Sequence, residues 1–145
     1  MHPRQKRLRL LGSCFVPLRR LGIEAILLPP AARRCWRGFP GAFDDLVVLF
    51  SFSKVSREGR MILEYQKQAG YRTLAFTSRS YLPEPDRADM NLFVYRGEAK
   101  EYHSMTAPAA LIDALVVAVS EKLGDEAVQR LSNLHRLKKA YDGNR

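Results

Sequence analysis

Hydrophobic residues in this chain occur either in short unbroken runs or in longer segments with helical spacing. The central run is Leu46–Phe50 (L-V-V-L-F), and after it Val55, Ile62 and Ala69 fall on one helical face. An uninterrupted run rich in β-branched and aromatic residues is typical of a strand buried on both faces, and such strands belong to parallel sheets covered by helices. The pattern therefore predicts a strand over 46–50, followed by a helix that ends at Gly70.

The same alternation continues along the rest of the chain. Further strands are predicted at 8–11, 23–28, 72–76 and 91–95, and further helices at 13–21, from Thr106 and from Asp125. Strands that alternate with helices specify a parallel sheet, here in a single three-layer α/β domain. A length of 145 residues is enough for one such domain with a full core.

The two C-terminal helices have the clearest helical patterns. Thr106 and Asp125 are expected to be their N-caps. The first of them is expected to face the core through Leu111, Leu115, Ala118 and Val119, and in the second Val128, Leu131, Leu134 and Leu137 repeat at helical spacing.

The net charge of +9 is concentrated near the N-terminus. Residues 1–45 contain nine Lys and Arg against three acidic residues, and the remaining residues contain fifteen against twelve. We expect a basic, poorly ordered arm over residues 1–12 and the folded domain over 13–145. The basic excess fits a solvated arm, a nucleic-acid contact or a funnel that attracts anions.

Nucleic-acid binding by this chain itself is not favoured. No helix-turn-helix, zinc-finger or RNA-binding signature accompanies the charge. The segment 31–43 interleaves aromatic residues with arginines, which fits base stacking or, as we favour, a loop held on the core by its rings.

Other classes of site and location are limited by the same composition. Cys14 and Cys35 form no C-x-x-C pair and the three histidines lie far apart, so we expect no metal site and no cofactor. The most apolar later segment, 107–119, contains Asp113 and is too short to span a bilayer. We expect a cytoplasmic protein without a membrane partner.

Hydroxyl side chains follow two of the predicted strands. Ser51, Ser53 and Ser56 follow one strand, and Thr77 and Ser78 follow the next. In open α/β sheets, ligands bind beyond the carboxyl ends of the strands, where the N–H groups of the next helix attract anions. Serine hydroxyls can donate to phosphate oxygens without adding charge. The cluster predicts a phosphate site, while the more common alternative is that these serines end a strand and cap a helix.

Several motifs together resemble the sugar isomerase (SIS) domain, especially that of the RpiR/MurR family of bacterial transcription regulators. The resemblance covers roughly Leu18 to Tyr141. It rests on these stretches of sequence: L-R-R-L-G-I, L-V-V-L-F-S-F-S-K-V-S-R-E, A-G-Y, T-L-A-F-T-S, A-D-M-N-L-F-V and S-M-T-A-P-A-A-L-I-D-A-L.

The resemblance implies a flavodoxin-like sheet that binds phosphosugars. The phosphate-holding serines of the family map onto Ser51, Ser53 and Ser56. Family regulators carry an N-terminal helix-turn-helix domain and dimerise through the SIS part. The resemblance thus implies a sugar phosphate ligand and a homodimer, with DNA as a partner only if a helix-turn-helix domain is present upstream or in a partner.

The sequence departs from the family pattern in three ways. The helix-turn-helix domain is absent, so the chain resembles a family member truncated at its N-terminus. The position after the second serine is usually glycine and is Lys54 here; a lysine adds a point charge toward phosphate, which we favour, or obstructs close backbone approach. The family's first strand and its glycine-rich loop are also not visible, so either 8–11 is a stunted first strand or the strand is missing.

Two functions follow from these observations, and we favour the first. The chain is predicted to be a non-catalytic, ligand-sensing phosphosugar-binding domain of an RpiR-like regulator. The candidate ligand-binding residues are Ser51, Ser53, Lys54, Ser56, Thr77 and Ser78. The alternative is an aldose–ketose phosphosugar isomerase, which needs an acid and a base, and for which His103 and Glu58 are the candidates.

Overall fold

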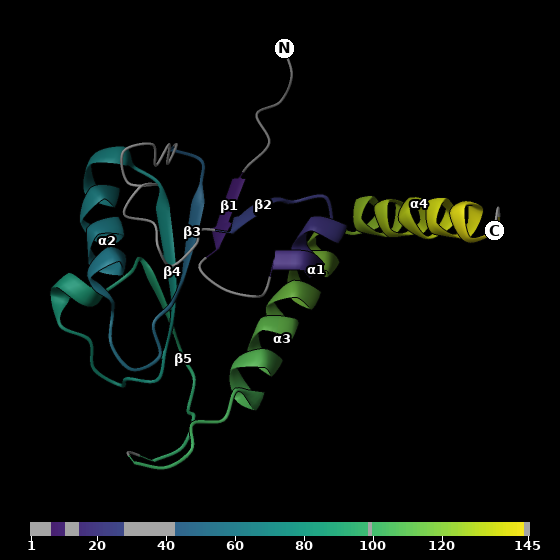
Figure 1. Cartoon of the computed structure of the whole chain (residues 1–145). Coiled ribbons are helices and arrows are strands. Elements are labelled where there is room, and N and C mark those ends of the chain that lie inside the picture. The colour runs from purple at the N-terminus through teal and green to yellow at the C-terminus, as the bar shows by residue number, and fades with distance from the viewer. Residues whose placement is uncertain (1–6, 11–14, 28–42, 99, 144–145) are drawn as a thin grey trace.

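The computed structural model describes residues 7–10, 15–27, 43–98 and 100–143 (Figure 1). Its strands are β1 (Arg7–Leu10), β2 (Glu24–Leu27), β3 (Leu46–Phe50), β4 (Arg72–Thr77) and β5 (Met90–Phe93). Its helices are α1 (Phe15–Arg20), α2 (Arg57–Ala69), the 3-10 helix η2 (Glu84–Asp86), α3 (Thr106–Leu123) and α4 (Asp125–Asp142). Each strand and helix predicted from the sequence is present, and only η2 was not predicted.

The five strands form one parallel sheet in the order β2-β1-β3-β4-β5. This is the flavodoxin-like order, in which the first strand lies between the second and the third. The first strand is therefore present but short, with four residues. Arg7–Leu10 lie within the segment 1–12 that the sequence assigns to the arm, so the structure differs from that boundary at these four residues. Residues 1–6 lie outside the described part, and an arm there stays a prediction.

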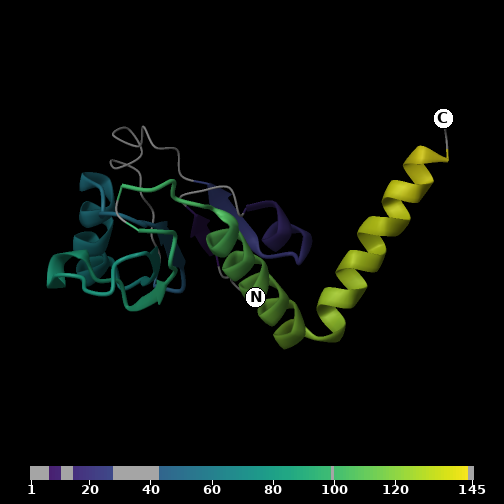
Figure 2. The same ribbon diagram turned by 90° about the horizontal axis from the view of Figure 1, so that it is seen from below.

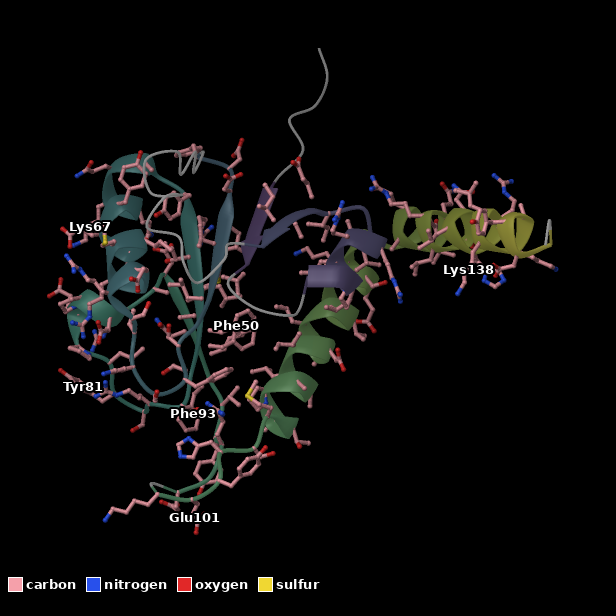
Figure 3. All side chains as sticks on the ribbon, viewed as in Figure 1. Phe50, Lys67, Tyr81, Phe93, Glu101 and Lys138 are labelled. Atoms are coloured by element: carbon pink, nitrogen blue, oxygen red, sulfur yellow. The ribbon has the colours of Figure 1, made fainter. Side chains whose placement is uncertain are left out.

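Two hydrophobic clusters, one on each face of the sheet, make three layers. Val47 and Leu49 point toward α2 and pack with Ile62, Leu63 and Tyr71. Neighbouring strand residues point to the opposite face because side chains alternate along a strand. There Leu18, Val48, Leu74, Phe76 and Val94 form the second cluster, and Phe50 with residues of α3 packs against it (Figure 3).

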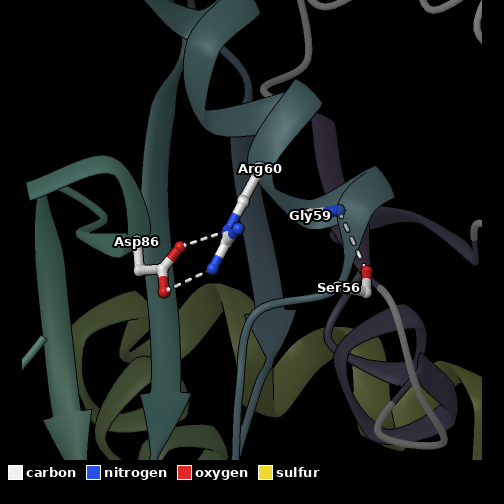
Figure 4. A network of polar contacts seen from close by, with 4 residues as sticks. All are labelled: Ser56, Gly59, Arg60 and Asp86. Carbon is white, nitrogen blue, oxygen red and sulfur yellow. Dashed lines mark hydrogen bonds and ion pairs between the residues drawn. The ribbon is translucent and has the colours of Figure 1, made fainter. Parts of the chain in front are cut away.

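The α2 side of the sheet is also held by polar contacts. Arg60 donates to both carboxylate oxygens of Asp86, through Nε at 2.6 Å and Nη2 at 3.1 Å (Figure 4). The hydrogen bond to Asp86 and then its charge raise the pKa of the Arg60 guanidinium. Asp86 is buried in η2, so this bidentate pair supplies the partner that a buried carboxylate needs.

The starts of the last two helices differ from the predictions. Thr106 and Asp125 are the first helical residues, the N-cap residues are Met105 and Gly124, and neither cap makes a side-chain hydrogen bond. A neighbouring hydroxyl serves Thr106 instead, because Ser104 Oγ accepts a hydrogen bond from the Thr106 N–H at 3.1 Å.

Two predicted core faces are also partly wrong. Leu111 and Leu115 pack on the sheet, but Ala118 is exposed. The repeated apolar positions of α4 are exposed because α4 projects away from the sheet (Figures 1 and 2). Among the described helices, none is long and apolar enough to cross a membrane.

The buried centre of β3 should dominate stability. Leu49 is 1% exposed, so Leu49→Ala should lower the free energy of unfolding by about 2–5 kcal/mol, the cost of lost burial plus a cavity. Met61→Ala is the control, because Met61 lies on the partly exposed side of α2, and it should cost less than about 1 kcal/mol. Urea denaturation followed by circular dichroism measures both, and equal losses would contradict this packing.

Candidate functional site

The two hydroxyl-containing segments lie side by side beyond the ends of β3 and β4. The Ser51 N–H donates to the Phe76 carbonyl at 2.9 Å, and the Ser78 N–H donates to the Phe52 carbonyl at 2.9 Å. These bonds continue the β3–β4 pairing past the last strand residues. The structure therefore brings the serine loop after β3 next to Thr77 and Ser78, as the parallel arrangement predicts.

Ser56 is the N-cap of α2. Its backbone is extended, and its Oγ accepts a hydrogen bond from the Gly59 N–H at 3.1 Å (Figure 4). The capping alternative is thus confirmed for this serine. The hydroxyl hydrogen of Ser56 stays available for donation. The N–H groups of Arg57 and Glu58, in the first turn, have no acceptor within the helix, so the same helix end can also serve an anion.

The other members of the loop have free side chains. Ser51 is half-buried, and Ser53 and Lys54 are exposed. Within the described residues, none of these three side chains makes a hydrogen bond or ion pair. They require no change in the fold to contact a ligand.

Thr77 and Ser78 differ in their surroundings. Thr77 is buried, and its Oγ1 accepts a hydrogen bond from the Arg79 N–H at 3.1 Å, which stabilises the turn after β4. The Ser78 Oγ atom is also buried, but it has no hydrogen-bond partner among the described residues. A buried hydroxyl without a partner is costly, and a bound water or ligand oxygen would satisfy it.

Arg96 lies against the serine loop, and the sequence analysis did not identify it. Its guanidinium carbon is 4.6 Å from the ring centroid of Phe52, which stands between Ser51 and Ser53. Arg96 also donates to the carbonyls of Ser104 and His103, both at 3.3 Å. These contacts hold a positive charge beside the loop. No local motif marks Arg96, since it is one arginine in a polar loop.

A hollow of about 410 Å³ lies beside Thr77, at the ends of β4 and β5. It is lined by Thr77, Arg79, Ser80, Tyr81, Leu82, Arg87, Asn91 and Phe93. Arg87 is fixed there, because its Nε donates to the Leu82 carbonyl at 2.8 Å and its guanidinium lies 5.8 Å from the Tyr81 ring. Of these residues the sequence analysis singled out only Thr77.

The two candidate catalytic residues lie on different elements. Glu58 is in the first turn of α2, close in sequence to the serine loop. His103 is exposed in the loop between β5 and α3. Within the described residues, neither side chain makes a hydrogen bond or ion pair. The described residues also contain no cluster of His, Cys, Asp or Glu that could hold a metal ion.

Comparison with known proteins identifies the fold. No protein-family model matches the sequence, and no curated protein sequence matches it. Solved structures do match. The sugar isomerase domain of an RpiR transcription factor from Sphaerobacter thermophilus has a TM-score of 0.72 at 20% identity, over 90% of this chain and 77% of that one.

Two further solved structures contain sugar phosphates. The NanR protein of Vibrio vulnificus, complexed with ManNAc-6P, has a TM-score of 0.73 at 16% identity, over 92% of this chain and 55% of NanR. A protein of E. coli CFT073 in complex with arabinose 5-phosphate has a TM-score of 0.68 at 19% identity, over 91% of this chain and 77% of that protein. The chain therefore has the fold of the sugar isomerase domains of RpiR-type regulators, as the sequence motifs indicate.

The cap and the exposed loop serine should differ in their effect on stability. Ser56→Ala should lower the free energy of unfolding by about 1 kcal/mol, because the Gly59 N–H loses its acceptor. Ser53→Ala should change it by less than about 0.5 kcal/mol, because Ser53 is exposed. Chemical denaturation of the ligand-free protein checks both, and a larger loss for Ser53→Ala would contradict the assigned cap.

Proposed function

We propose that this chain binds a sugar phosphate, with the phosphate group on the loop 51–56 and the N-terminus of α2. The observation that carries the proposal is the arrangement of Ser51, Ser53 and Ser56 between the end of β3 and the start of α2. Hydroxyl donors and helix N–H groups together form the kind of site that binds a phosphate.

The second strand end adds further polar groups to this site. The Ser78 Oγ lacks a partner among the described residues, and the Ser78 N–H bond to Phe52 holds it beside the loop. The two similar structures complexed with ManNAc-6P and arabinose 5-phosphate support a sugar phosphate over inorganic phosphate alone.

Two cations give the site the charge that a phosphate dianion requires. Lys54 is exposed within the loop, and Arg96 is stacked on Phe52. Their contributions differ, because Arg96 is held in place while Lys54 is a point charge on a flexible side chain. Lys54 therefore acts mainly through long-range attraction, and Arg96 provides a fixed positive charge.

We further propose that the domain senses its ligand rather than converting it, as part of an RpiR-like regulatory system in the cytoplasm and as a homodimer. Proton transfer between adjacent sugar carbons needs a base within reach of the substrate. Glu58 and His103 lie on separate elements and share no contact. DNA binding would require a helix-turn-helix domain, upstream or in a partner.

Removal of the loop hydroxyls should weaken sugar phosphate binding. Ser51→Ala and Ser53→Ala should each raise the Kd for either of the two sugar phosphates named above about tenfold, the loss of one hydrogen bond to a charged group. Isothermal titration calorimetry measures the effect, with Ser132→Ala on α4 as the matched control. Binding of neither sugar phosphate, or equal affinity in all variants, would overturn the proposal. Turnover of either compound that is lost in His103→Ala would favour the isomerase instead.

Lys54 should assist binding by its charge. Both Lys54→Ala and Lys54→Gly should raise the Kd several-fold and reduce its dependence on salt, because an attraction to the phosphate is lost. Lys67→Ala, at the other end of α2 (Figure 3), is the control and should leave the Kd unchanged. If Lys54→Gly instead binds more tightly than the wild type, the lysine obstructs the backbone approach that glycine would permit.

A further inference from the structure

The last helix, α4, exposes most of its apolar side chains. Val128, Leu131, Leu134, Leu137 and Tyr141 are 62%, 40%, 46%, 67% and 70% exposed, respectively. Of the residues of α4 only Ala127 is buried. A contiguous apolar strip of this kind on a projecting helix marks an interaction surface, because helices in water are stabilised mainly by burying an apolar face.

The direction of α4 is fixed by contacts in its first two turns. Ala127 is 1% exposed, and Arg130 Nη1 donates to the Gly22 carbonyl at 3.0 Å. Glu126 also pairs with Arg130 Nη2 at 2.6 Å. A Cβ at Gly22 would lie 1.5 Å from Arg130 Nη1, so this anchor requires a glycine. The helix therefore leaves the domain in a defined direction (Figures 1 and 2).

The neighbouring helix α3 has an uncovered apolar face of small residues. Its inner face packs on the sheet through Leu111, Ile112, Leu115 and Val116. Its outer face exposes Ala107, Ala110, Ala114, Val117 and Ala118. Because alanine side chains are short, a second helix can approach this face closely, and larger side chains of that helix can fit over it.

The two faces complement each other but do not meet within one chain. Both helices have 18 residues, and each is therefore about 27 Å long. Gly124 alone joins them, and its backbone (φ 56°, ψ −131°) turns α4 away from α3. The leucine strip of α4 can therefore reach an alanine face only on another molecule.

The charges beside the two faces are also complementary. Asp113 and Glu121 are exposed on α3, and Arg136, Lys138 and Lys139 are exposed on the distal half of α4. None of these five side chains forms an ion pair among the described residues. Opposite charges at the rim of a contact favour the correct register and partner.

We propose that α4 of each molecule packs on the outer face of α3 of a second copy. The exchange is reciprocal, so one two-fold symmetric dimer buries both leucine strips and both alanine faces. Two such helix contacts are of the size of a stable interface, about 800 Å² on each partner. This inference supplies a surface for the homodimer proposed above and does not depend on sugar phosphate binding.

Sedimentation of the full chain without sugar phosphate tests the exchange. The wild type should be a dimer at roughly 100 µM, a concentration well above a micromolar Kd. The double variants Leu134→Glu/Leu137→Glu on α4 and Ala114→Glu/Ala118→Glu on α3 should each be monomers. Ser132→Glu/Asn133→Glu, which adds the same charge to the polar side of α4, should remain a dimer. A monomeric wild type would overturn the proposal.

A mixture of the two monomeric variants distinguishes exchange from pairing of α4 with α4. In the mixture, the intact α4 of one variant can bind the intact α3 face of the other, so heterodimers should appear. If α4 paired with α4, the mixture would remain monomeric and the proposed surface would be wrong. The milder Leu137→Ala, which favours helix formation, should still weaken the dimer about tenfold, independently of any folding defect.

Discussion

The sheet depends on the pairing of four residues, Arg7–Leu10, between β2 and β3. Each of the four is in register with β2, and three of them are also in register with β3. Neighbouring strands lie about 4.8 Å apart, so without β1 the edges of β2 and β3 would be separated by about twice that distance and could not bond. The short first strand joins β2 to the rest of the sheet. The position of α1 depends on it, because α1 packs beside β2 through Leu18 and Ala25.

The loop after β3 combines a structural role with a proposed binding role. Ser56 ends the loop by capping α2, and the backbone bonds of Ser51 and Phe52 to β4 fix its start. The capping and phosphate interpretations of the serines are therefore compatible. A helix end that is capped by a serine keeps its dipole and its first N–H groups, and the bonds that stabilise the ligand-free loop also position it for an anion.

The fold could be predicted because its signals are local. The apolar run Leu46–Phe50 and the glycine at position 70 define β3 and the end of α2 without help from distant residues. The site could be predicted in part, since its serines follow a strand directly. Arg96 and Arg87 could not, because they reach their positions through contacts with Phe52 and Leu82 that only the folded chain makes. The exposure of α4 was also hidden, since helical spacing of leucines does not reveal which molecule covers them.

The hydrogen bond between Arg130 and Gly22 joins residues 108 positions apart. Such a contact forms only after most of the chain has folded, since closing a long loop costs entropy before any contact offsets it. With few other contacts to the domain, α4 is the part that opens at the lowest free energy. Amide hydrogens of α4 should consequently exchange with solvent before those of β3, and covering α4 by a second molecule would slow that exchange. The folding order and the assembly of this protein are thereby coupled through one arginine and one glycine.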